Sequence, residues 1–169
     1  MKPDIKLEMP QGQELFRVGI VSDTHDLLRP AAAETLRTCG CILHGGDVSG
    51  EKTLNALREI APVYAVRGNN DRGPWAGQLP ERLRITVAGV RFYMIHNKKD
   101  LPEGLGKADA DVILYGHSHR YFCQEKDGVL WLNPGSCGRR RFGLPITMAV
   151  MEICGDGFKV EALQFAQEK

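Results

Sequence analysis

Up to about residue 70 the chain alternates between short apolar runs and helical patterns, and this alternation restricts the fold more than any other feature. Three runs have the length and the β-branched content of buried strands: Leu15–Val21, Cys41–His44 and Pro62–Arg67. One helix is expected from Pro30, because proline suits the first helical turn, and another over Glu51–Ile60, with Ser49 as its N-cap. A β-α-β-α-β order predicts a parallel sheet with right-handed crossovers.

The pattern changes further along the chain, where glycine-containing turns separate paired apolar runs. Three hairpins are expected: Arg82–Val87 with Val90–Ile95, Tyr121–Glu125 with Val129–Leu132, and Ile146–Ile153 with Phe158–Gln164. Asp111–Tyr115 is a further buried strand. We therefore expect a second half that is mostly antiparallel, and two packed sheets with helices outside. Residues 1–14 are expected to be an N-terminal extension and residues 15–169 a single domain, since one domain usually has about 100–200 residues.

Composition excludes several classes of protein. The chain is 43% hydrophobic and 25% charged, as in soluble globular proteins, and its formal net charge is only +1. Such a chain has no global field to attract nucleic acid, so a nucleic-acid partner is not expected. No apolar run approaches the length of a membrane span, so no membrane association is expected either. The five cysteines form no CxxC pair, which favours free thiols in a reducing cytoplasm. The hairpin edges leave a homo-oligomer open.

Polar residues able to bind metal ions follow five of the expected strands. They are Asp23-Thr24-His25, Gly45-Gly46-Asp47, Gly68-Asn69-Asn70-Asp71, His96 and Gly116-His117-Ser118-His119. Ligands of open α/β sheets lie beyond the carboxyl ends of the strands, where these residues are expected. A chain of this composition would contain the three motifs D-x-H, G-N-x-D and G-H-x-H together by chance with a probability of only roughly 10⁻⁴. We therefore expect one composite metal site.

The ligand types restrict the metal. Imidazole mixed with carboxylate oxygen suits Mn, Zn, Fe, Co or Ni rather than Ca or Mg alone. Six or seven ligands exceed what one tetrahedral ion needs, whereas two ions about 3.5–4 Å apart would use them all. Asp47 is the expected bridge between the two ions, because it lies in a tight Gly-Asp turn between the other groups.

The order D-x-H, G-D, G-N-x-D, a single His and G-H-x-H resembles the calcineurin-like metallophosphoesterase superfamily. The compact length and the stretch Asn133-Pro134-Gly135-Ser136 resemble its small YfcE-type phosphodiesterase branch. This resemblance implies an α/β fold, a four-layer αββα sandwich of two mixed β-sheets flanked by helices. It also implies two divalent transition-metal ions, with Mn²⁺ the first candidate and Zn²⁺, Ni²⁺, Fe²⁺ or Co²⁺ as alternatives. One ion would be held by Asp23, His25, Asp47 and His119, and the other by Asp47, Asn69, His96 and His117.

The activity implied is hydrolysis of phosphodiesters by a hydroxide that bridges the two ions. Asp47, Asn70, Asp71 and His96 are the expected catalytic residues, and Asn70 and Arg139 the expected substrate contacts. Members of the superfamily often read G-N-H-[DE], so Asn70 stands where a proton-donating histidine is usual. Asp71 either orients a metal-bound water or a ligand, or caps the following turn. The run Arg139–Arg141 either grips a phosphate or forms a solvated loop.

Two other functions remain open at this point. The first is a phosphomonoesterase acting on a small or nucleotide substrate. The second is a scaffold, because a subunit of the retromer resembles these enzymes in fold. The complete ligand set favours the enzyme, since a scaffold has no need of every metal ligand.

Overall fold

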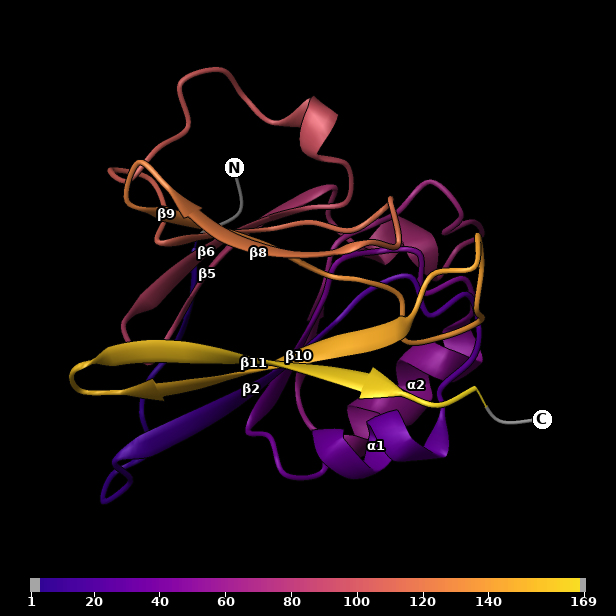
Figure 1. Ribbon diagram of the computed structural model, residues 1–169, viewed down its shortest axis with the longest axis horizontal. Helices are drawn as coiled ribbons and strands as arrows, with labels where there is room; N and C mark the ends of the chain where they lie inside the picture. Colours follow the sequence, from indigo (N-terminus) through magenta and orange to yellow (C-terminus); the bar gives the residue numbers. More distant parts are fainter. Residues whose placement is uncertain (1–3, 168–169) are drawn as a thin grey trace.

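Two β-sheets packed face to face form the frame of the computed structural model, which describes residues 4–167 (Figure 1). The five-stranded sheet has the order β11-β10-β2-β3-β4, and the six-stranded sheet has the order β1-β5-β6-β7-β9-β8. Strands of the five-stranded sheet are β2 (Leu15–Val21), β3 (Cys41–His44), β4 (Val63–Ala65), β10 (Ile146–Cys154) and β11 (Gly157–Phe165). Strands of the six-stranded sheet are β1 (Ile5–Leu7), β5 (Arg82–Val87), β6 (Val90–Ile95), β7 (Val112–Leu114), β8 (Tyr121–Lys126) and β9 (Val129–Pro134).

The main core lies between the two sheets and consists of a large cluster of buried hydrophobic side chains. Side chains such as Val18 and Leu43 from one sheet pack against Phe92, Met94 and Leu114 from the other. Burying side chains of this size stabilises a fold by about 1.5–3 kcal/mol each. The core therefore fixes how the two sheets face one another, and with them the loops that leave the strand ends.

Within residues 4–167, both α-helices lie on one side of this sandwich. Helices α1 (Pro30–Leu36) and α2 (Glu51–Ile60) lie on the outer face of the five-stranded sheet, where Leu36 and Leu57 are buried (Figure 1). The outer face of the six-stranded sheet is covered by the loop of residues 96–111, which contains the 3₁₀ turn η2 (Lys98–Asp100). A second 3₁₀ turn, η1 (Ala76–Gln78), precedes β5. Two mixed sheets with flanking helical segments confirm the predicted α/β fold class, with one outer layer reduced mostly to loop.

The start of α2 differs from the prediction. Its N-cap is Gly50, and no side chain caps the helix, so the assignment of Ser49 as the cap is wrong. An N-cap residue needs an extended backbone, whereas Ser49 has a left-handed φ of 64°. The backbone N–H of Ser49 instead donates to Asp71 Oδ1 at 2.8 Å, so this residue belongs to the loop beyond β3.

The three predicted hairpins are antiparallel, and the six-stranded sheet also contains parallel pairs that the sequence did not predict. Strand β7 pairs in parallel with both β6 and β9, and β1 pairs in parallel with β5. The reason lies in β7 itself, whose three residues Val112–Leu114 are all buried, because an apolar strand covered on both faces fits the middle of a parallel arrangement. Strand β10 belongs to the five-stranded sheet instead, where it pairs antiparallel with β2.

The expected N-terminal extension contributes a strand. Residues Ile5–Leu7 pair with Ile85–Val87 at the edge of the six-stranded sheet. Residues 1–3 of that extension, and residues 168–169 at the end of the expected domain, lie outside the described residues. Among residues 4–167 no helix has both the length and the apolar character needed to cross a membrane.

Candidate metal centre

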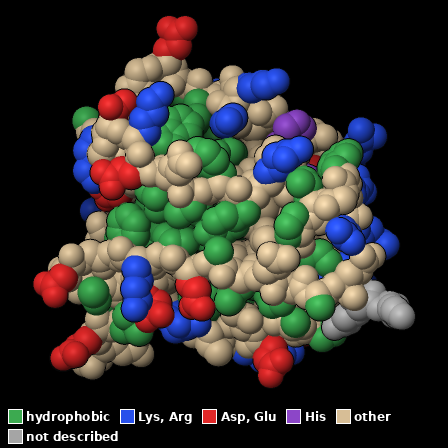
Figure 2. Space-filling view, viewed as in Figure 1, with side chains coloured by type: hydrophobic (Ala, Val, Ile, Leu, Met, Phe, Trp, Pro, Cys, Tyr) green, Lys and Arg blue, Asp and Glu red, His purple; other side chains and the backbone are tan. Residues whose placement is uncertain are grey.

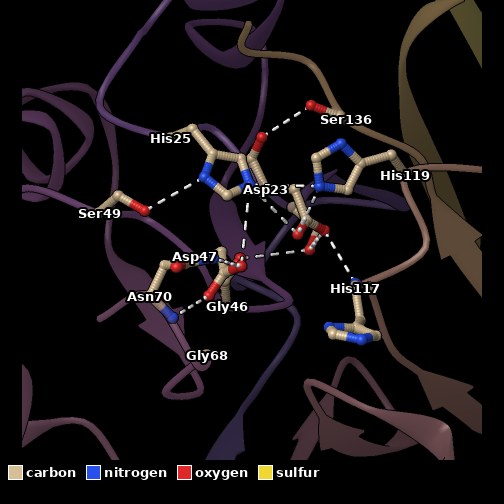
Figure 3. A network of polar contacts seen from close by, with 12 residues as sticks. Asp23, His25, Gly46, Asp47, Ser49, Gly68, Asn70, His117, His119 and Ser136 are labelled. Atoms are coloured by element: carbon tan, nitrogen blue, oxygen red, sulfur yellow. Dashed lines mark hydrogen bonds and ion pairs between the residues drawn. The ribbon is translucent and has the colours of Figure 1, made fainter. Parts of the chain in front are cut away.

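The loops that follow β2, β3, β4, β6 and β7 meet at one end of the sandwich and bring the predicted ligands together. Figure 3 shows the imidazoles of His25 and His119 on either side of the Asp23 carboxylate, with Asp47 beside them. On the face seen in Figure 2, histidine reaches the surface next to Lys and Arg side chains. The sheets therefore place at one edge residues that are far apart in sequence, as the strand-end pattern predicts.

Asp23, His25 and His119 form a first group that could hold a metal ion. The Nε2 atoms of the two imidazoles lie 3.2 Å apart, and Asp23 Oδ1 lies 3.3 Å from His119 Nε2 and 3.7 Å from His25 Nε2. All three side chains are buried. Three lone-pair donors therefore point at a common centre.

Asp23, Asp47 and His96 form a second group of the same kind. His96 Nε2 lies 3.4 Å from Asp47 Oδ2 and 3.9 Å from Asp23 Oδ1. The other ring nitrogen, Nδ1, lies 2.7 Å from the carbonyl of Gly45, which fixes it as the protonated nitrogen and leaves Nε2 as a free ligand atom. Asp47 Oδ2 also lies 3.7 Å from His25 Nε2, so both carboxylates face both groups.

Buried polar atoms without hydrogen-bond partners test whether metal ions fit here. Within residues 4–167, Asp23 Oδ1 and His96 Nε2 are buried and accept or donate no hydrogen bond. An unpaired buried polar atom costs about 1–3 kcal/mol, so such atoms need a partner that the protein chain does not supply. Both atoms face the point where the two groups meet. The residues present therefore fit divalent metal ions.

Asn69 and His117 lie at the exposed margin of the second group. His117 Nδ1 lies 3.2 Å from Asn69 Oδ1, and the His117 ring stands edge-on to that of His96 with centroids 5.3 Å apart. The backbone N–H of His117 donates to Asp23 Oδ2 at 3.1 Å. Both predicted ligands are thus next to the centre, but their side chains contact each other.

The backbone around the centre is held in an uncommon conformation. Five of the predicted ligands have left-handed φ values between 46° and 74°: Asp23, His25, Asp47, His117 and His119. A non-glycine residue in this region costs of order 1–3 kcal/mol, and such residues gather at functional sites. Backbone hydrogen bonds hold the two loops together, from Asp23 N to Gly46 O at 2.9 Å and from His25 N to Asp47 O at 3.1 Å.

Close backbone approach explains one of the glycines. A Cβ atom at Gly68 would overlap both the backbone nitrogen and the carboxylate of Asp47. Only glycine lets the loop after β4 pass this near to Asp47.

Asn70 and Asp71 both act on Asp47. Asn70 donates its backbone N–H to Asp47 Oδ1 at 2.8 Å and its side-chain amide to Oδ2 at 2.9 Å. Asp71 is 1% exposed and accepts three backbone N–H groups, those of Gly68 (2.7 Å), Ser49 (2.8 Å) and Asp47 (2.9 Å). Its carboxylate therefore joins the loops after β3 and β4.

Three residues outside the predicted ligand set support the ligands, and of these only His44 was expected from the sequence to have a supporting or structural role. Ser22 donates to Asp23 Oδ2 at 2.7 Å, and Ser136 donates to the Asp23 carbonyl at 2.7 Å. His44 is fully buried, accepts from Gly46 N through Nδ1 at 3.0 Å and bonds Thr24 Oγ1 through Nε2, so both nitrogens are used. The N-P-G-S stretch was a signal for Ser136, whereas nothing in the sequence distinguishes Ser22.

The carboxylates of the centre are held in their charged form. Burial alone would raise the pKa of Asp23, but His119 and His25 beside it hold that pKa well below its ordinary value. Burial would likewise raise the pKa of Asp47, but His96 and Asn70 lower it to about 2. Burial lowers the pKa of His44 to about 4, so this histidine is neutral. The site therefore presents anionic oxygen at neutral pH.

The basic run lies on the His25 side of the centre. Arg139 is exposed and donates from Nε to the carbonyl of His25 at 3.3 Å. Arg140 points elsewhere and bonds Gln167 Oε1 at 2.9 Å. Phe142 follows in the same loop, 78% exposed, with its ring centroid 5.6 Å from that of His119. Of this run, only Arg139 is shown to contact a residue of the centre.

Comparisons with known proteins agree with this geometry. Residues 16–156 match the model of the calcineurin-like phosphoesterase superfamily domain. A probable metallophosphoesterase of Methanothermobacter thermautotrophicus is 32% identical over 158 residues, which cover 86% of this chain and 89% of that protein. A phosphodiesterase of Methanocaldococcus jannaschii is 27% identical over 158 residues, covering 81% of this chain and 93% of that protein.

Solved structures show the same fold. The structure of Vacuolar Protein Sorting 29 from Cryptosporidium parvum matches with a TM-score of 0.73 at 21% identity, covering 92% of this chain and all of that one. The family match confirms the resemblance seen in the motifs, and together with the ligand groups it supports a metal-dependent phosphoesterase.

Proposed function

We propose that this chain, which belongs to the calcineurin-like phosphoesterase superfamily, is a phosphodiesterase that works with two divalent transition-metal ions. One observation carries the proposal: two ligand groups meet at the Asp23 and Asp47 carboxylates, and among residues 4–167 no group forms a hydrogen bond with Asp23 Oδ1 or His96 Nε2. A single ion would leave one of the two groups without its metal.

Each ion has its own set of proposed ligands. Asp23, His25, Asp47 and His119 would hold one, and Asp47, Asn69, His96 and His117 the other. Carboxylate with imidazole favours Mn²⁺ first, with Zn²⁺, Ni²⁺, Fe²⁺ or Co²⁺ as alternatives. When bound, such ions lower the pKa of water toward about 7 and neutralise charge on the phosphate oxygens.

The chain's own residues position and select the substrate. Asn70 keeps Asp47 in place through two hydrogen bonds, and its amide has a second N–H that can donate to a substrate oxygen. An amide cannot release a proton at neutral pH, so Asn70 stabilises a departing oxygen without protonating it. Asp71 and His96 fix the loops and the ligand geometry. Arg139 lies at the rim, where it can meet a phosphate oxygen. This arrangement favours diesters with good leaving groups.

Location and self-association complete the proposal. The five cysteines are free thiols, which supports the reducing cytoplasm as the location.

Strands β8 and β11 lie at sheet edges and could pair with the same strands of a second copy, which supports a homo-oligomer. Light scattering would detect it.

Hydrolysis of bis-(p-nitrophenyl) phosphate tests the proposal directly. Chelator-treated protein should be inactive, and Mn²⁺, Zn²⁺, Ni²⁺ or Mg²⁺ added singly should identify the ion that restores activity. Asp47→Asn should abolish the restored activity, whereas Asp127→Asn, the same change in an exposed turn, should keep it.

Parallel assays separate the alternatives. Faster hydrolysis of p-nitrophenyl phosphate than of the diester would favour a phosphomonoesterase. A scaffold is the second candidate because Vacuolar Protein Sorting 29 has the same fold. Folded protein with no activity toward either ester, whichever metal is added, would support the scaffold and contradict the enzyme.

A further inference from the structure

A cavity of about 570 Å³ adjoins the second ligand group, and the part of it that lies away from the metal ligands has no role in the chemistry above. Asn69, His96 and His117 form the wall nearest the centre. Three arginines line other parts of the same cavity: Arg67, Arg72 and Arg82. A group placed in this cavity would therefore lie between the metal ligands and guanidinium groups.

The three arginines come from separate parts of the chain that the fold holds together. Arg67 follows β4, Arg72 follows the loop of metal ligands, and Arg82 begins β5. The backbone N–H of Arg67 donates to the carbonyl of Pro80 at 2.8 Å, which fastens the first loop to the segment that precedes β5. This backbone contact holds the segment that carries Arg67 beside the segment that leads to Arg82.

These guanidinium groups are available to a ligand. In the part of the chain that the structure describes, none of the three forms an ion pair within 4.0 Å, and all are exposed. The one hydrogen bond among their side chains runs from Arg67 Nε to the carbonyl of Asp71 at 3.3 Å, which leaves both terminal nitrogens of Arg67 free.

Carboxylates also line the cavity and oppose the positive charge of the arginines. Glu81 and Asp100 line the cavity and are exposed, so two acidic groups oppose three arginines. Asp71 also lines it, but its carboxylate is buried and accepts three backbone N–H groups. Among the exposed side chains of the lining, guanidinium groups therefore outnumber carboxylates by one.

We propose that this cavity binds a second phosphate group carried by the substrate, at a distance from the phosphodiester that is hydrolysed. The assignment rests on the proposed function. Guanidinium groups donate paired hydrogen bonds that match phosphate oxygens, and three of them suit a group with a charge near −2. The substrate class is therefore a phosphodiester that also carries a phosphate monoester, as in a phosphorylated nucleotide ester.

A matched pair of substrates tests this assignment. The p-nitrophenyl ester of thymidine 3′-phosphate is compared with the same ester carrying an added 5′-phosphate, so the leaving group is unchanged. The wild-type enzyme should show kcat/KM about tenfold higher for the 5′-phosphorylated ester, the size expected for roughly one charge-assisted contact. Arg72→Gln combined with Arg82→Gln should bring that ratio close to one.

Arg84→Gln is the control, because Arg84 lies on the same strand as Arg82, outside the cavity, over the ring of Tyr93. It should keep the tenfold preference. Equal kcat/KM for the two esters in the wild type, or a preference that survives in the double variant, would overturn the assignment.

A binding measurement separates this inference from the proposed hydrolysis. Calorimetry on chelator-treated protein compares thymidine 3′,5′-bisphosphate with thymidine 3′-phosphate. If the bisphosphate binds more tightly and this preference disappears in the double variant, the cavity binds the second phosphate. This conclusion would hold even if neither ester is hydrolysed, and only the proposed function would then fail. Hydrolysis of both esters without any preference, and equal binding of both nucleotides, would leave the function in place and reject the cavity.

Discussion

Replacing Asp71 with asparagine should destabilise the protein although the side chain keeps its shape. Oδ2 accepts the N–H groups of Asp47 and Gly68, and Oδ1 accepts that of Ser49. An asparagine carbonyl can take the place of only one of these oxygens. Its amide would then face a backbone donor, most simply the N–H of Ser49, which would lose its partner inside the protein.

The magnitude follows from these contacts. A buried donor left without an acceptor costs about 1–3 kcal/mol, and the two retained bonds weaken because the acceptor loses its charge. Burial raises the pKa of Asp71 despite its three N–H partners, so removing the charge returns part of that cost. A net loss of about 2 kcal/mol remains. With a urea m-value of about 2 kcal/mol/M, the midpoint should fall by about 1 M.

Urea denaturation at pH 7 with excess chelator measures this loss without a contribution from metal binding. Asp127→Asn is the matched control, since Asp127 has a left-handed φ of 53° in an exposed turn that asparagine tolerates. Its midpoint should stay within about 0.25 M of the wild type, because surface substitutions usually change stability by less than about 0.5 kcal/mol. An Asp71→Asn midpoint as close to the wild type as that would refute a role for Asp71 in joining the two loops.

Three further predictions concern leaving groups, pH and metal. Asn70→His should raise the rate on alkyl phosphodiesters relative to aryl ones, since histidine can protonate a poor leaving group; an unchanged alkyl-to-aryl ratio would contradict this. Asp111→Asn should lower the free energy of unfolding by about 1–2 kcal/mol at pH 7, because Asp111 accepts hydrogen bonds from Arg91 and Lys107. This figure already allows for screening by the solvent around these side chains. Burial would raise the pKa of Asp111, but Arg91 and Lys107 hold that pKa well below its ordinary value. The stabilisation by Asp111 is therefore present above about pH 4 and is lost as the pH falls further. Denaturation curves of the wild type and of Asp111→Asn should converge in acid. Removing metal with a chelator should lower the melting temperature of the wild type, and Asp23→Asn should abolish most of that difference; equal melting temperatures with and without chelator would count against a metal that binds the folded state.

The sequence predicted the strands and helices well because most of them have strong local signals. The limits of β2, β3, α2, β5 and β6 match the expected ranges. The hairpin turns Ala88-Gly89 and Asp127-Gly128 both adopt left-handed φ at their two central residues, which glycine-containing pairs permit. Pairing between distant strands was harder to predict. The parallel partners of β7 and the return of β10 to β2 depend on which faces become buried, and local patterns carry no such information.

The candidate site was predictable to the extent that its residues carry their own chemistry. Asp23, His25, Asp47, His96 and His119 converge as the strand-end pattern predicts. The supporting contacts were less accessible. Ser22 is one of four serines, and only the fold places it against Asp23. The arginines around the cavity lie in three segments that share no motif. Arginines that only the tertiary structure brings together have no characteristic spacing in the sequence.

The placement of β10 between β11 and β2 affects how the chain can fold during its synthesis on the ribosome. Strand β2 is made early, but its antiparallel partner emerges only after the whole six-stranded sheet has been translated. Until then one edge of β2, which carries the start of the Asp23 loop, has open backbone groups and can pair with another chain. Nascent chains of this protein should therefore depend on chaperones until β10 leaves the ribosome, and stalling before Ile146 should produce aggregates rather than a smaller folded unit.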